Sequence, residues 1–185
     1  GSGANRTLTA TPLANQNGAA TITVTVTDPA GNSANDTFVL TVTAVNDPPT
    51  LSALSNQIIA EDAPAQTVNL SGITVGPGNE TGQTLTITAK SSNSSIVPDP
   101  TVTYTSANAT GTLSYTPVAN ANGTVTITVV ETDNGGIANS GINAVTNTFN
   151  VLVTPVNDEP PLAALGDKSV SEGSTLSFTA SASDR

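Results

Sequence analysis

Apolar and polar residues alternate along most of the chain with a period of two. The alternation is clearest in residues 21–27, 37–43, 84–89, 102–105, 112–116, 124–130, 148–154 and 175–179. In these segments Val, Ile, Leu, Phe or Tyr occupies one side of an extended chain and mostly Thr the other, as in strands with one buried and one solvated face. No segment repeats its apolar residues at helical spacing. The pattern therefore predicts an all-β protein of short strands.

Turn-forming residues separate several of these strands. Residues 28–32, 76–79 and 133–136 are rich in Gly, Pro, Asn and Asp, which favour turns for steric and hydrogen-bonding reasons. About seven short strands in roughly 110 residues is typical of an immunoglobulin-like or cadherin-like sandwich. We expect an antiparallel Greek-key β-sandwich.

The sequence also repeats itself. Residues 7–18 match residues 112–123, and the match continues until Asp28 meets Asp133. An insertion around residues 135–144 shifts the register for the rest of the repeat. Self-similarity at a fixed period indicates tandem copies of one structural unit.

The phase of the repeat defines three units. We predict the C-terminal half of a repeat in residues 1–47, a complete repeat in residues 48–158 and the start of a further repeat in residues 159–185. Half a sandwich exposes strand edges, so we expect the incomplete ends to be covered either by neighbouring repeats of the same chain or by other copies in an assembly.

Composition restricts the chemistry available to the chain. It has no His, Cys, Met or Trp, and charged residues make up 10% of it. Imidazole bases, thiol nucleophiles and disulfides are excluded, and we expect no enzymatic activity. The formal net charge of −10 argues against a nucleic acid partner. No apolar run reaches the roughly 18 residues of a membrane span, so we expect no direct membrane insertion.

An Asn-Asp pair followed by prolines stands at both repeat boundaries. The two motifs are Asn46-Asp47-Pro48-Pro49 and Asn157-Asp158-Glu159-Pro160-Pro161. Proline stiffens a linker, and Asn and Asp offer oxygens to a hard cation. Together with the sandwich pattern, these linkers resemble those of cadherin repeats, and more closely the cadherin-like repeats of giant bacterial surface proteins. The resemblance covers nearly the whole chain.

The resemblance implies calcium between successive repeats. The matching positions form two sets of candidate ligands, which are Asn46, Asp47 and Asp133 at the first junction and Glu61, Asn157, Asp158 and Asp184 at the second. Other family positions have changed: Ala44 and Pro155 replace a linker aspartate, and an aspartate pair is reduced to Asn79 and Glu80. We therefore expect at most about one ion per junction, completed by carbonyls and water. The alternative is that these acidic residues are solvated turn and linker positions.

Taken together, these features predict a structural spacer or stalk of an extracellular, adhesin-type bacterial surface protein. The alternative is a module that binds glycan or protein through its loops, chiefly residues 135–147. Intramolecular isopeptide bonds from Lys90 or Lys168 would need a buried lysine, and both lysines stand beside polar residues.

Overall fold

The computed structural model describes residues 5–183 and is all-β, which confirms the predicted fold class. No α-helix occurs among these residues. The strands are β1 (Gly18–Thr27), β2 (Ser33–Val42), β3 (Gln57–Ala60), β4 (Gln66–Ser71), β5 (Leu85–Ser91), β6 (Thr101–Thr103), β7 (Thr110–Tyr115), β8 (Gly123–Asp133) and β9 (Ala144–Thr154). Two short 3-10 turns, η1 (Gly78–Glu80) and η2 (Ala138–Ser140), complete the elements.

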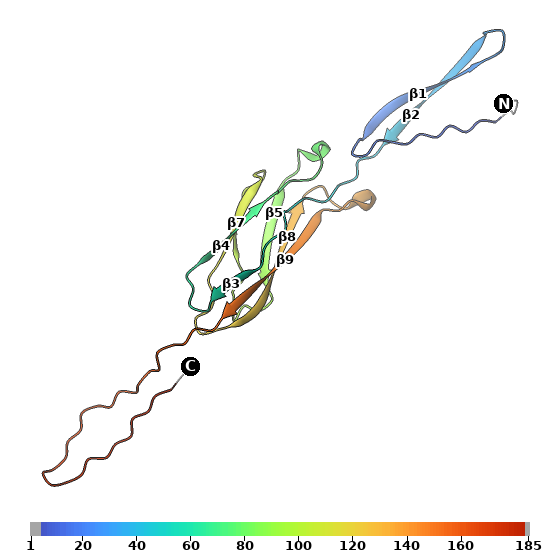
Figure 1. Ribbon diagram of the computed structural model, residues 1–185. Coiled ribbons are helices and arrows are strands. Elements are labelled where there is room, and N and C mark those ends of the chain that lie inside the picture. Colours follow the sequence, from blue (N-terminus) through green and yellow to red (C-terminus); the bar gives the residue numbers. More distant parts are fainter. Residues whose placement is uncertain (1–4, 184–185) are drawn as a thin grey trace.

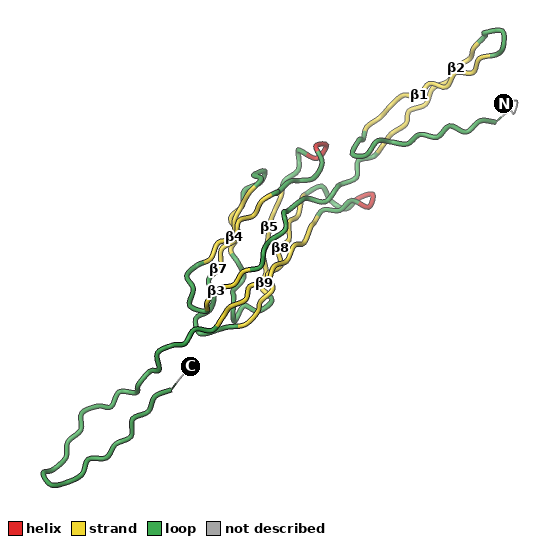
Figure 2. The backbone as a smooth tube through the Cα atoms, viewed as in Figure 1, coloured by secondary structure: helices red, strands yellow, loops and turns green. Residues whose placement is uncertain are grey.

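The molecule is elongated. Strands β3 to β9 form a central sandwich, and the β1–β2 hairpin and the C-terminal segment project from its opposite ends (Figure 1). Figure 2 shows that the linker to the hairpin and the C-terminal segment up to residue 183 are loop. All seven strands of the sandwich lie within the predicted complete repeat, residues 48–158.

The sandwich has Greek-key topology. One sheet has the order β3-β9-β8-β5 and the other the order β4-β7-β6. Strand β3 pairs with β9 in parallel, and the other pairs within the two sheets are antiparallel. The chain therefore crosses repeatedly between sheets, which places its first strand beside its last.

The core lies between these two sheets. Along β8 every second residue is buried, beginning with Val125, Ile127 and Val129, while the threonines between them face outward. Strand β9 contributes Phe149 and Val151, and the opposite sheet contributes residues such as Leu70 and Leu113. Burial of this apolar surface is the main stabilising term for the central repeat.

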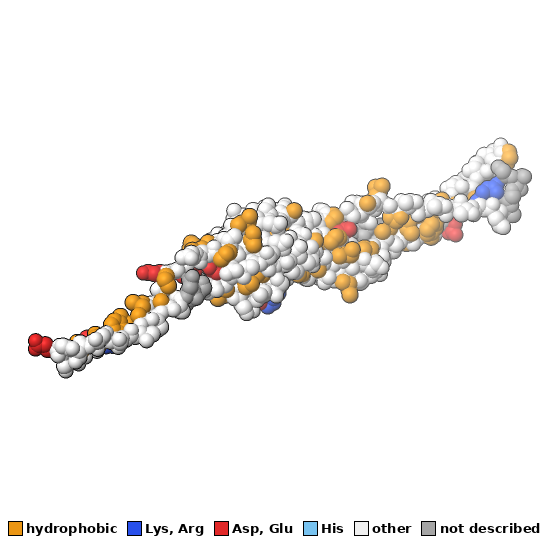
Figure 3. All heavy atoms as spheres, turned by 60° about the horizontal axis from the view of Figure 1, so that its bottom comes forward, with side chains coloured by type: hydrophobic (Ala, Val, Ile, Leu, Met, Phe, Trp, Pro, Cys, Tyr) orange, Lys and Arg blue, Asp and Glu red, His pale blue; other side chains and the backbone are white. Residues whose placement is uncertain are grey.

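The β1–β2 hairpin has the alternating apolar residues of a buried strand pair, but no second sheet among the described residues covers them. Ile22 is the counterpart of Ile127 in the internal repeat, yet the neighbouring Val24 and Phe38 are 43% and 46% exposed. A two-stranded hairpin has no second layer to cover its apolar face. Hydrophobic side chains are accordingly visible on the narrow parts of the molecule in Figure 3.

The strand predicted at residues 175–179 is wrong. Residues 159–183 contain no strand and are joined across by one isolated bridge, Leu162 to Ala182. Alternation of apolar and polar residues is compatible with a strand, but a strand also needs the edge of another strand to pair with. Residues 175–179 pair with none of the described residues. Conversely, β3 and β4 were not predicted. Strand β3 is short and carries no alternation, whereas β4 does alternate, with Val68 and Leu70 buried.

Candidate functional site

The first junction lies where the linker passes the N-terminal end of the sandwich. The side chain of Asn46 donates from Nδ2 to Asp133 Oδ1 at 3.0 Å and to the carbonyl of Ile142 at 2.7 Å. Its Oδ1 accepts a bond of 2.7 Å from Gln83 Nε2. The linker asparagine and the late aspartate, predicted to share this junction, are thus in direct contact.

Glu80 joins the same end of the sandwich. The 3-10 turn η1 carries it, and its Oε1 accepts a 2.8 Å bond from the backbone N–H of Asp47. Glu80 is buried although its side chain is polar. In the sequence, Glu80 stands where the cadherin-like family has an aspartate pair, and it was not predicted as a ligand. The structure makes it a candidate because it contacts the linker.

Several buried oxygens at this end have no hydrogen-bond partner within residues 5–183. They are Glu80 Oε2, Gln83 Oε1, Asp133 Oδ2 and both carboxylate oxygens of Glu131. A buried carboxylate or amide oxygen without a partner is costly, and hard oxygen donors are what calcium takes. No three acidic side chains in the described part of the chain form a ready-made metal cluster. A cation here would therefore depend on amide and backbone oxygens as well as carboxylates.

Glu131 is a second residue that the sequence analysis did not select. The alternation of β8 points it inward in line with Val125, Ile127 and Val129, and it is fully buried. Burial, and then the charge of Asp133, raises the pKa of Glu131 to about 7. The burial of Glu131 could have been predicted from the sequence, because it follows Val125, Ile127 and Val129 in the series of alternate residues that point into the core.

The second junction is assembled differently. Glu61 is buried after the end of β3, and its two oxygens accept bonds from Val156 N at 2.8 Å and Asn122 Nδ2 at 3.0 Å. These bonds lower its pKa. Glu61 therefore fixes the chain just before Asn157 and Asp158, but both of its oxygens already have protein partners.

The two oxygens of Glu61 bond to Val156 and Asn122, and not to Asn157 or Asp158, the other described residues predicted as ligands of this junction. Asn157 is exposed, and its Nδ2 donates to the carbonyl of Asp158 at 3.2 Å. Asp184 lies outside the described residues. The first junction is thus the better developed of the two.

Asp28, the counterpart of Asp133 in the first repeat, serves its own turn. Its Oδ1 accepts bonds from the backbone N–H groups of Ala30 and Asn32, and its Oδ2 accepts from the Asn32 side chain. These bonds lower the pKa of Asp28. The same aspartate position therefore closes a tight hairpin in one repeat and contacts the linker in the other.

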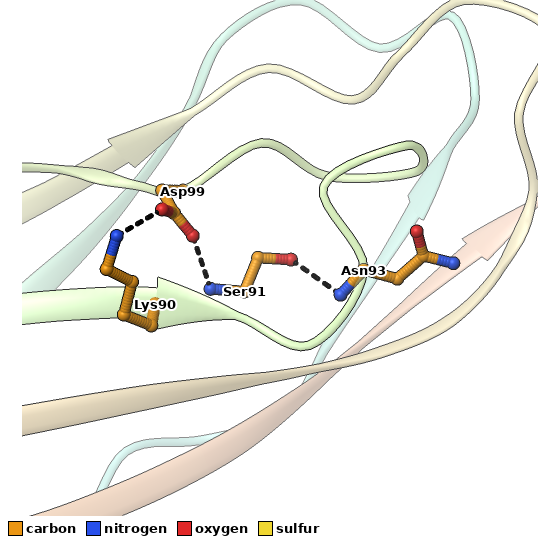
Figure 4. A network of polar contacts seen from close by, with 4 residues as sticks. All are labelled: Lys90, Ser91, Asn93 and Asp99. Carbon is orange, nitrogen blue, oxygen red and sulfur yellow. Dashed lines mark hydrogen bonds and ion pairs between the residues drawn. The ribbon is translucent and has the colours of Figure 1, made fainter.

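Lys90 lies in a surface network rather than in the core (Figure 4). Its Nζ is 2.6 Å from Asp99 Oδ2, and Asp99 Oδ1 accepts a bond from Ser91 N at 2.8 Å. The Lys90 side chain is 76% exposed. This exposure argues against the buried, reactive amine that an isopeptide bond requires.

The fold defines an all-β Greek-key sandwich with a linker at each end. None of the described residues form a helix long and apolar enough to cross a bilayer. No protein-family model matches the chain, and no curated protein matches it in sequence.

Solved structures of the S-layer protein SbsC are similar to this chain at a low level. The structure of its domains 4 and 5 is 17% identical with a TM-score of 0.34, over 73% of this chain and 70% of that one. The structure of its domains 4–9 is 18% identical with a TM-score of 0.38, over 84% of this chain and 25% of that one. These values are too low to transfer any property of those proteins to this chain.

Proposed function

We propose that this chain is a spacer segment of an extracellular, adhesin-type bacterial surface protein, and that calcium stiffens its repeat junctions. The observation that carries the proposal is the convergence of Asn46, Glu80 and Asp133 where the linker meets the sandwich. The segment itself does no catalysis in this proposal.

The elongated arrangement supports a spacer role. The linkers leave the sandwich at opposite ends (Figure 1), so tandem copies extend along one direction. The prolines at residues 48–49 and 160–161 limit the conformations of each linker. A string of such units transmits length and orientation, which is what a stalk requires.

The oxygen atoms gathered at the first junction support the proposal that calcium binds there. Asp133 and Glu80 each keep one buried oxygen without a partner among the described residues, and Gln83 adds an amide oxygen. When bound, calcium would neutralise these carboxylates and provide the electrostatic attraction that holds linker and sandwich together. Asp133 and Glu80 would hold it from the sandwich, and Asn46 would keep the linker beside Asp133.

Thermal unfolding in calcium and in chelator tests this function. At a calcium concentration about 100 times the dissociation constant, we expect the folded state to gain about 2.7 kcal/mol and the melting temperature to rise by several degrees. Asp133→Asn should remove most of this gain, because it withdraws a carboxylate from the junction. Asp99→Asn is the matched control: it changes a surface carboxylate outside the junctions and should leave the calcium response intact.

Two outcomes would contradict the calcium proposal. One is an equal melting temperature in calcium and chelator at matched ionic strength. The other is a calcium response that survives Asp133→Asn and Glu80→Gln unchanged.

A further inference from the structure

The loop between β8 and β9 is the largest difference between the two homologous hairpins. It spans residues 134–143, whereas the loop between β1 and β2 spans residues 28–32. We call residues 134–143 the clamp loop. A longer loop is tolerated at modest entropic cost, so its contacts decide what it does.

The clamp loop is hydrogen-bonded to the linker. Ile142 N donates to the carbonyl of Asn46 at 2.9 Å, and Asn46 Nδ2 donates back to the carbonyl of Ile142 at 2.7 Å. Asn139 Nδ2 adds a 3.3 Å bond to the carbonyl of Ala44. Linker and loop thus each donate a hydrogen bond to the other. The Asn46 side-chain amide donates where a backbone N–H would donate between two paired strands.

Two glycines make this close approach possible. A Cβ on Gly135 would lie 1.7 Å from Asn46 Oδ1, and one on Gly141 would lie 2.9 Å from Asn46 Cβ. No atom lies within 4 Å of the corresponding position on Gly82. The clamp loop is therefore shaped around Asn46, and a side chain at Gly135 cannot be added without moving it.

Asn46 also connects the clamp loop to the sandwich. The same side chain contacts Asp133 at the end of β8 and Gln83 beyond η1. The clamp loop with the adjoining end of β8, and the segment that carries Gln83, therefore hold one linker residue. The matching residue of the second linker, Asn157, is exposed and bonds to Asp158 beside it.

We infer that the clamp loop fixes the direction of the first linker by direct hydrogen bonds to Asn46, without need of a metal ion. Among the described residues, the Glu61 bond to Val156 is what holds the second linker before its Asn-Asp pair. The two junctions thus differ in stiffness, and the clamped one keeps its direction when calcium is withdrawn. The value of such a clamp to a stalk rests on the proposed spacer function, but its existence does not.

Backbone ¹⁵N relaxation of the full chain in chelator tests the inference. We expect order parameters near 0.85 for the amides of residues 44–47, as in the sheets, and below about 0.6 for residues 157–159. Asn46→Ala should lower the first set toward the second while the sandwich amides stay rigid. Asn157→Ala is the matched control and should leave residues 44–47 unchanged.

Gly135→Ala gives an independent readout through steric exclusion. It should loosen residues 44–47 as Asn46→Ala does, whereas Gly82→Ala should not. The melting temperature of the central sandwich, measured for every variant, separates loss of the clamp from unfolding.

Mobile residues 44–47 in chelator would overturn the inference, and so would an Asn46→Ala chain whose linker relaxes like the parent's. Calcium is then added to the same samples. If residues 44–47 are already rigid in chelator and calcium binds nowhere, the clamp stands and the calcium proposal fails. If they become rigid only with calcium, the clamp fails and the calcium proposal stands.

Discussion

Ile127→Ala is expected to lower the free energy of unfolding of the central sandwich by about 3 kcal/mol. Ile127 is fully buried in the middle of β8, between two sheets that cannot close over the missing methyl groups. This loss is a large share of the stability of an ordinary domain, which is about 5–15 kcal/mol.

The internal repeat supplies the matched control for this prediction. Ile22 occupies the same place in the repeat, in the β1–β2 hairpin, but is only half-buried. Ile22→Ala should therefore cost less than about 1 kcal/mol. Urea unfolding followed by far-ultraviolet circular dichroism measures both variants. Equal losses would show that the hairpin carries a core of its own and would contradict the fold described above.

Glu131→Gln is expected to stabilise the sandwich by up to about 3 kcal/mol at pH 8 in chelator. Glu131 is fully buried, and neither of its oxygens has a partner within residues 5–183. Its folded-state pKa of about 7 lies above the ordinary value of 4.5 because of burial and the charge of Asp133. The neutral amide removes the need to bury a charge.

The same shift sets the pH dependence. Because the folded pKa is raised, the stabilising contribution of protonated Glu131 is fully present below pH 4.5 and is lost as the pH rises through about 7. The parent chain should lose stability across this window relative to Glu131→Gln. Urea midpoints from pH 4.5 to 8 measure the difference between the two chains. A constant difference across that range would contradict the assigned role of Glu131.

The strands were largely predictable because their signal is local. Alternation located β1, β2, β5, β6, β7, β8 and β9 to within a few residues, since one buried face imposes a period of two on any sheet of this kind. Residues 175–179 carry the same local signal but form no strand. Pairing depends on a distant edge, which no local pattern contains.

Only part of the candidate site could be predicted from the sequence. The resemblance to cadherin-like repeats implied that Asn46 and Asp133 share one junction, and they are in contact. Glu80 and Gln83 join them through the path of a loop, and the clamp loop reaches the linker through Ile142 and Asn139. These contacts follow from how loops return over the end of a sandwich, which neither composition nor period encodes.

The central claim, that cations join the repeats at defined junctions, is tested most directly by calcium titration of the ¹⁵N-labelled chain. We expect saturable shifts confined to the amides of residues 46–47, 80–83 and 131–135, with a weaker second set around Glu61 and residues 156–158. Asp36, Asp99 and Asp167 are acidic residues outside the candidate ligand sets, and their amides should not move. Shifts spread evenly over all acidic residues without saturation would show that calcium only screens the charge of the chain, and would contradict the proposal.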